Sequence, residues 1–181
     1  MNRKNFMAAA AAALALTFGL VNAPEAEANG KGKQKGPTLV DVAIAVNSSG
    51  PYAGQFDTLI AAVLAADPAV LQRLSAKRQS TVFAPTDGAF EALGLTPANI
   101  GDFDEGALTQ ILLYHVVNGR RDANDVLAST QLRTLQGSFL KQSAGRLTDN
   151  LGREATIIVT DVPAANGIIH AIDAVVLPFA P

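Results

Sequence analysis

The chain contains only two histidines, and each lies inside an apolar run. His115 is part of ILLYHVVNG at residues 111–119, and His170 is part of NGIIHAIDAVVLP at residues 166–178. An imidazole in such surroundings could act as a general base, bind a metal ion, or be buried as a hydrogen-bonding residue. Which of these applies depends on the acids, nucleophiles and ligands that the rest of the chain supplies.

The surrounding sequence does not favour catalysis or metal binding. A serine nucleophile of the α/β-hydrolase type needs a G-x-S-x-G turn, and the sequence has none. Zinc sites usually combine closely spaced ligands, whereas the two histidines form no H-x-x-x-H or H-x-H pattern. The chain has no cysteine, and GKGKQKG lacks the serine or threonine of a phosphate-binding loop. We therefore expect no enzyme activity, no metal site and no cofactor.

Both histidines are better explained as structural residues. Unpaired buried polar groups are costly, so we expect each ring to have hydrogen-bond partners that hold a strand end in place. If Tyr114 to Val117 is extended, Tyr114 and His115 face opposite sides, and one of the two rings points toward the core. His170 would share a strand face with Ile168.

Five other polar or turn residues also have local structural explanations. Thr86 or Asp87 would cap a short helix that follows the strand STVFAP. Asn166-Gly167 is predicted to be a tight turn in which the glycine supplies a positive φ angle. Asp173 is expected at the end of the last strand.

Composition limits the other possibilities. A chain of 181 residues with 49% hydrophobic content can bury the core of one domain, and we see no internal repeat. The net charge is -2 and only 17% of residues are charged, so the basic stripe typical of nucleic-acid binding is missing. We therefore expect one globular domain without nucleic-acid partners.

The N-terminus has the organisation of a secretory signal peptide: the basic MNRKN, the apolar FMAAAAAALALTFGLV, then AEA. We predict cleavage after Ala28; the alternative is an uncleaved anchor, although the apolar run is shorter than the roughly 20 residues of a span. Residues 29–37 are predicted to be a flexible Gly/Lys-rich leader, whose lysines could alternatively contact an anionic surface. Residues 38–181 would form the domain of a secreted protein, periplasmic or extracellular, without a stable membrane span after cleavage.

The elements that position these residues change from helical to extended along the chain. TLVDVAIAV, with Thr38 as N-cap, QFDTLIAAVLAAD, AVLQRLSA and GALTQILL carry apolar residues at helical spacing. The predicted apolar stripe of the second helix consists of Phe56, Leu59, Ile60, Val63 and Leu64. From YHVV onward, short extended runs alternate with Gly, Asn and Asp turns, which predicts antiparallel strands. The order of elements predicts an α+β domain.

Three segments carry a resemblance to a known family. TVFAPTDGAF (81–90), ILLYHVV (111–117) and NGIIHAIDAVVLP (166–178) resemble the two homology segments and the central Tyr-His motif of the fasciclin (FAS1) domain family. The similarity extends over residues 38–178 and is closest to the small secreted bacterial single-domain type. It implies a FAS1-type, wedge-shaped β-sandwich of about seven strands with several packed α-helices.

The resemblance also implies a function. FAS1 domains are non-enzymatic interaction modules in cell adhesion and in extracellular matrix or envelope association. In animal relatives, integrin binding has been attributed to positions that correspond here to Tyr114, His115, Asp161 and Val162, where valine replaces isoleucine. We expect Tyr114 and Asp161 to contact a partner protein, or a second copy of the chain, while His115 holds the strand. The alternative is a small apolar molecule, a lipid or a polysaccharide bound in a groove between helices and sheet.

Overall fold

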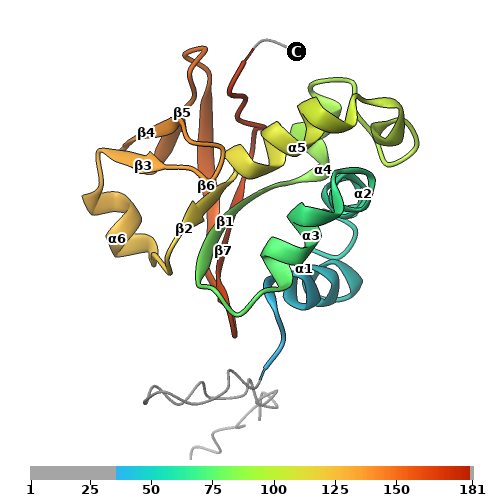
Figure 1. The fold of residues 1–181 in the computed structure, drawn as a ribbon. Coiled ribbons are helices and arrows are strands. Elements are labelled where there is room, and N and C mark those ends of the chain that lie inside the picture. Colours follow the sequence, from blue (N-terminus) through green and yellow to red (C-terminus); the bar gives the residue numbers. More distant parts are fainter. Residues whose placement is uncertain (1–35, 180–181) are drawn as a thin grey trace, which may run out of the picture. The chain divides into compact units, whose positions relative to one another are not determined.

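A computed structural model describes residues 36–179 of the chain (Figure 1). The predicted signal peptide, its cleavage site and most of the leader lie outside these residues. The helices are α1 (Leu39–Ser48), α2 (Asp57–Ala65), α3 (Pro68–Ser75), α4 (Asp87–Glu91), the 3-10 helix η1 (Ile100–Asp102), α5 (Glu105–Tyr114) and α6 (Ala123–Ala128). The strands are β1 (Ser80–Pro85), β2 (Val116–Asn118), β3 (Gln131–Arg133), β4 (Phe139–Ser143), β5 (Arg146–Thr148), β6 (Glu154–Ala164) and β7 (Gly167–Ile172). The predicted α+β class is confirmed.

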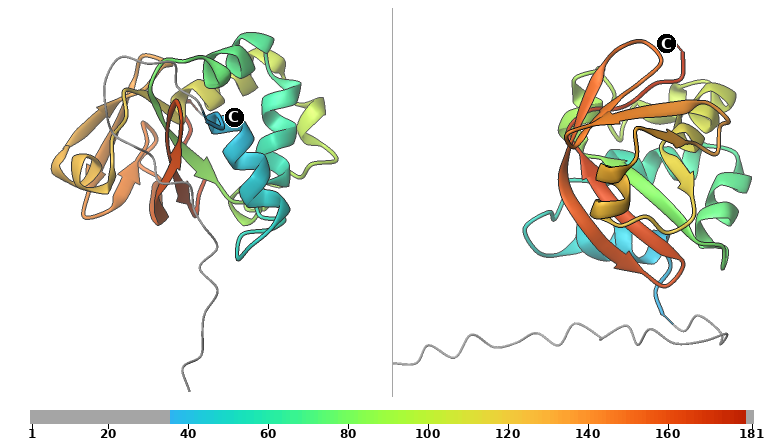
Figure 2. Two further views of the ribbon diagram at one scale, coloured as in Figure 1. Left: turned by 90° about the horizontal axis from the view of Figure 1, so that it is seen from below. Right: turned by 90° about the vertical axis from the view of Figure 1, so that its left-hand side faces the viewer.

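The strands form one sheet in the order β2-β1-β7-β6-β5-β4-β3, in which only β1 and β7 run parallel. The two end strands approach each other through a bridge between Val117 and Thr134, and the Leu135 N–H donates to the Val116 carbonyl at 2.7 Å. The sheet therefore folds over, and its two halves face each other (Figure 2). This arrangement is the expected seven-stranded sandwich.

Two apolar cores follow from the alternation of side chains along the strands. Ala84 on β1 and Ile169 on β7 face the helices and belong to the larger core. Phe83 and Ile172, which are one and three positions away on the same strands, point between the two halves of the sheet and belong to the smaller, inner core. Residues 174–177 continue this alternation after β7, because Ala174 and Val176 pack in the inner core whereas Val175 and Leu177 pack under the helices.

Helix α1 begins as predicted, with Thr38 as its N-cap. The Asp41 N–H donates to Thr38 Oγ1 at 3.4 Å, and the Thr38 N–H donates to Asp41 Oδ2 at 2.8 Å. This reciprocal pair is a capping box, which satisfies amides that the first turn of a helix leaves free.

Thr86 occupies the N-cap position of α4 as predicted, but the predicted hydrogen bond is wrong, because the side chains of Thr86 and Asp87 accept none from that helix. Asp87 instead accepts from the backbone N–H groups of Asp57 at 3.2 Å and Thr58 at 2.8 Å, at the start of α2. The N-cap of α2 is Phe56, whose side chain has no acceptor. A carboxylate about thirty positions later in the chain therefore caps α2, a pairing that only the tertiary fold creates.

The buried face of α2 also differs from the predicted stripe. Leu64 is 70% exposed, whereas Thr58 and Ala62 are fully buried. The helix packs on its small residues, which allow its backbone to approach its neighbours closely. Ile60 and Val63 are consequently only half-buried, and they border a cavity between α1, α2 and α3.

Candidate functional site

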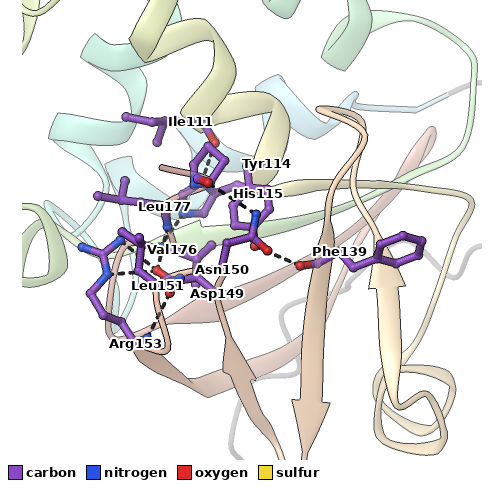
Figure 3. A network of polar contacts seen from close by, with 11 residues as sticks. Ile111, Tyr114, His115, Phe139, Asp149, Asn150, Leu151, Arg153, Val176 and Leu177 are labelled. Atoms are coloured by element: carbon purple, nitrogen blue, oxygen red, sulfur yellow. Dashed lines mark hydrogen bonds and ion pairs between the residues drawn. The ribbon is translucent and has the colours of Figure 1, made fainter. Parts of the chain in front are cut away.

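His115 lies immediately after the last residue of α5 and has a helical backbone conformation, with φ -82° and ψ -2°. Its side chain is buried, and Nδ1–H donates to the Ile111 carbonyl at 2.8 Å while Nε2 accepts from the Val176 N–H at 3.2 Å (Figure 3). Burial lowers the pKa of His115 to about 4, so the ring is neutral at neutral pH. Both nitrogens have partners, and the ring joins the end of α5 to the C-terminal segment.

Tyr114 is the last residue of α5 and is fully buried, so the expectation that it contacts a partner is wrong. The chain becomes extended only from Val116, and consecutive helical residues point about 100° apart. Tyr114 therefore enters the inner core, where its hydroxyl donates to the Phe139 carbonyl at 2.9 Å. Burial, with the nearby charge of Asp149, raises the pKa of Tyr114 to about 12.

We expect Tyr114→Phe to lower the free energy of unfolding by about 1–2 kcal/mol, because it leaves the Phe139 carbonyl without its hydroxyl donor. The ring would still fill the inner core, so binding to any partner should be unchanged. Urea unfolding measures the first effect, and Tyr52→Phe, at a half-buried tyrosine without a hydroxyl hydrogen bond in the described structure, is the matched control. A loss of binding at full stability would contradict a purely structural role for Tyr114.

Asp149 is a buried acid that sequence reasoning missed. Its carboxylate accepts hydrogen bonds from the backbone N–H groups of Leu151 at 2.8 Å, Arg153 at 2.9 Å and Leu177 at 3.0 Å, and from the Arg153 guanidinium at 2.8 and 2.9 Å. Burial alone would raise the pKa of Asp149, but these donors hold it below the usual value. The sequence TDNLGR indicates a turn around Asp149, yet it gives no signal for the long-range contact to Leu177.

His170 is fully buried on β7 and points away from the helices. Its Nε2–H donates to the Arg121 carbonyl at 2.9 Å, Nδ1 accepts from the Asp161 N–H at 3.2 Å, and the ring stacks on Phe83 at a centroid distance of 5.6 Å. It thereby joins β7 to the segment before α6 and to β6. As in His115, the two nitrogens have protein partners, which leaves no free nitrogen for chemistry.

Asp161 is the only exposed residue of the four predicted partner-binding positions. It has a φ angle of 61° at an irregularity of β6 between Val159 and Val162, and its Oδ1 accepts from the Ala123 N–H at 2.9 Å, at the start of α6. Val162 is half-buried in the core under the helices. Since β1 and β7 separate β2 from β6, the Tyr-His segment and Asp161 do not form one patch. The binding surface predicted from these four residues is therefore wrong, because the Tyr-His segment is buried and lies apart from Asp161.

Asn166 lies in the hairpin loop between β6 and β7 and connects three elements. Its Oδ1 accepts from the Leu39 N–H at 2.8 Å, and its Nδ2 donates to the carbonyls of Leu74 and Ala76 at 2.7 Å each. It therefore joins the start of α1 to the end of α3. A turn residue by sequence is a buried tertiary connector in the structure.

The last strand is constrained at both ends. Gly167 does not have the positive φ angle that we predicted, because the turn ends at Asn166 and Gly167 is already paired in β7. It is required by space instead, since a Cβ atom there would lie 2.0 Å from the Ser80 carbonyl oxygen. At the other end, Asp173 Oδ1 accepts from the Thr156 N–H and its own N–H donates back to the Thr156 carbonyl.

An apolar cavity of about 110 Å³ lies between α1, α2 and α3 and extends to β1, β2 and β7. Every lining residue except His115 has an aliphatic or aromatic side chain. The most exposed lining residues are Ile44 and Leu64, at 45% and 70%. Because both nitrogens of His115 are already bonded, the cavity offers no free polar side-chain group to a ligand.

A second cavity of about 30 Å³ adjoins the first and shares Ala43, Leu59, Ala84 and Ile169 with it as lining residues. Val162 also lines it, so the half-buried side chain of this predicted binding residue faces the helix side of the sheet. We call the two together the helix-side cavity.

Within residues 36–179, no three His, Asp or Glu side chains come together in a way that could hold a metal ion. In the same range no single helix is long and apolar enough to span a membrane, although α2 and α3, bent by 117°, would pass together by length and composition.

Comparison with known proteins places these features in a family. The fasciclin domain model matches residues 54–178. Protein sll1483 of Synechocystis sp. is 43% identical over 127 residues, which are 68% of this chain and 67% of that protein. The uncharacterized protein sll1735 of Synechocystis sp. is 35% identical over 144 residues, which are 78% of this chain and 98% of that protein. A solved FAS1 domain pair from the insect cell adhesion molecule fasciclin I aligns with a TM-score of 0.49 at 25% identity, over 64% of this chain and 42% of that chain.

The family match includes β1, the Tyr114-His115 pair and the last strand with Asp173, so it covers the segments whose contacts are described above. It extends over more than half of the chain, and two relatives are matched over two thirds or more of their own length. The chain belongs to the fasciclin domain family.

Proposed function

We propose that the chain is a secreted interaction module that associates with an extracellular or envelope protein, after removal of residues 1–28. Membership of a family of adhesion and extracellular interaction domains supports this proposal. The structural support is an exposed part of β6, because β5 pairs only with residues 154–156 and leaves residues 158–163 with one free edge. Ile158 and Asp161 are exposed there, and we call residues 158–163 the β6 edge.

Recognition at the β6 edge would use side chains and not strand addition. An exposed edge normally invites pairing with another strand, but proteins prevent this with bulges and proline. The β6 edge has register shifts on both sides of Val159 and contains Pro163. The exposed apolar side chain of Ile158 is therefore the contact that we expect a partner to use. Asp161 is the exposed acid of the same segment, and its Oδ1 already accepts from the Ala123 N–H.

A substitution that places a charge on the β6 edge tests this proposal. Ile158→Glu should weaken binding of the purified chain to envelope or matrix protein of the producing cells by about tenfold or more, because a partner would have to bury a carboxylate. Phe139→Glu on β4 is the matched control, since Phe139 is 47% and Ile158 48% exposed. Biolayer interferometry measures both.

Equal binding by Ile158→Glu and the unchanged chain would exclude the β6 edge as the contact surface. Sedimentation velocity at several concentrations identifies the case in which the partner is a second copy. Tyr114 is not a suitable probe, because any truncation of this buried ring changes stability.

A second candidate function is the binding of an apolar molecule in the helix-side cavity. The observation that favours it is an opening between helices whose lining is apolar throughout, apart from a fully bonded histidine. Pockets of this kind are typical of sites for apolar ligands. This function and protein binding at the β6 edge use different residues, so each can be tested while the other is intact.

A further inference from the structure

We propose that the helix-side cavity binds a single linear alkyl chain, with the methyl end inside the protein and any polar group at the solvent. This inference rests on the second candidate function and names its ligand class. The volume of the cavity limits how much of a ligand it can enclose. A cavity of about 110 Å³ is smaller than the roughly 300 Å³ or more that encloses a whole drug-sized ligand, so only part of a ligand can enter it.

The arrangement of the lining residues limits the shape of the ligand. The two cavities share Ala43 and three other lining residues, and Ile44 and Leu64 are the exposed lining residues of the larger one. The apolar surface is therefore elongated, from Val162 inside to Leu64 at the solvent. A narrow path of this kind fits an extended chain better than a compact ring system.

The polarity of the lining limits the chemistry of the ligand. Apart from His115, the side chains that face the larger cavity are aliphatic, because the ring of Phe83 points into the inner core and stacks on His170. The single polar residue of this lining, His115, has one nitrogen donating to Ile111 and the other accepting from Val176. An inner polar group on the ligand would lose its hydration without gaining a partner, which is costly. The inner end of the ligand must therefore be hydrocarbon.

The charged residues of the surrounding helices favour a dissolved amphiphile over a bilayer as the source of the alkyl chain. The charged residues of α1 and α2 are Asp41 and Asp57, and the one basic residue of the three helices is Arg73 on α3, whose guanidinium donates to Asn118. The three helices therefore carry no cluster of basic residues. Anionic bilayers attract clusters of basic residues next to the inserted apolar groups. We therefore infer that the alkyl chain comes from a dissolved amphiphile, and not from a bilayer on which the helices rest.

The experiment titrates the chain purified from the producing cells with octanoate, decanoate and dodecanoate by isothermal calorimetry. Affinity should rise about fourfold for each added methylene, which corresponds to about 0.8 kcal/mol per buried CH₂ group. Undecanoate should bind about tenfold or more tightly than 1-adamantanecarboxylate, a compact acid with the same number of carbon atoms.

Variants locate the site. Ala43→Leu enlarges a side chain that lines both cavities and should reduce dodecanoate affinity by about tenfold or more, because each displaced methylene contributes about fourfold. Ala45→Leu makes the same change on an exposed position of α1 that lines neither cavity and should have no effect. If Ala43→Leu does not fold, Leu64→Asp at the opening replaces it, with Leu127→Asp on α6, at 53% exposure, as its control.

The titrations and the vesicle experiment separate the shape of the ligand, the existence of an apolar site and the source of the alkyl chain. Equal binding of undecanoate and the adamantane acid would overturn the linear chain but leave an apolar-ligand function standing. Absence of binding by every acid would overturn both. Sedimentation with phosphatidylglycerol vesicles should show no association, and association that Leu64→Asp abolishes would show that the source of the chain is a bilayer.

Discussion

Asp149→Ala is expected to lower the free energy of unfolding by about 3–5 kcal/mol, a large part of the stability of a domain of this size. The substitution removes the acceptor of three backbone N–H groups and of the Arg153 guanidinium. The Leu177 amide is buried and would have no other partner. Asp149→Asn keeps the shape and one acceptor oxygen, so a loss of about 2 kcal/mol is expected. Guanidinium unfolding at pH 7 measures both variants.

The chain provides a matched control for this prediction. Arg146 and Glu154 form an ion pair of the same length, 2.8 Å, but their side chains are 61% and 53% exposed. Exposed pairs contribute about 0–1 kcal/mol, so Glu154→Ala should have little effect. If Asp149→Ala and Glu154→Ala cost the same, burial of the Asp149 carboxylate, whose exposed fraction is 0%, would not be the cause of its contribution.

Acidification is expected to destabilise the domain through His115. The folded pKa of His115 is about 4, below the unfolded value of about 6.5, because burial disfavours the charged ring. Between these values the unfolded chain binds a proton that the folded chain does not, so stability falls as pH falls from about 6.5 toward about 4. The total loss is about 3 kcal/mol, at about 1.4 kcal/mol per pKa unit, and it levels off below the folded pKa.

His115→Gln separates this effect from all others. Glutamine does not titrate, so the variant should be less stable than the unchanged chain at pH 7 but should lose less stability between pH 6.5 and about 4. His170 is present in both proteins, and the difference between the two curves therefore reports His115 alone. Urea unfolding at a series of pH values gives this difference. Parallel curves would show that His115 is not held neutral by burial.

His115 and Asp149 both bind the C-terminal segment after β7. His115 accepts from the Val176 N–H and Asp149 accepts from the Leu177 N–H, so two side chains from different elements fix consecutive amides. The side chains of Val176 and Leu177 point into different cores. The C-terminal segment thus joins the sheet sandwich to the helical layer, and loss of either acceptor should loosen both.

The candidate sites differ in how far the sequence predicts them. The Tyr-His motif identifies a segment that the fold depends on, but helix geometry buries both of its rings. Asp161 was predicted from the family resemblance, and Pro163 nearby indicated a position near the surface, but the register shifts of β6 are set by its pairing with β7. A groove between helices and sheet was the predicted alternative, but its lining residues could not be predicted, because Ile60, Val63 and Leu64 belong to an ordinary apolar stripe in the sequence.

The sequence by itself determined the α+β class, the Thr38 cap, the strand STVFAP and the three helices that precede this strand. These features depend on periodicity and capping within a few residues. Only the tertiary structure decided that Asp87 caps α2 and that Asn166 connects α1 to α3. Such contacts join residues far apart in the chain, and a short polar side chain has the same local signature whether it caps its own helix or a distant one.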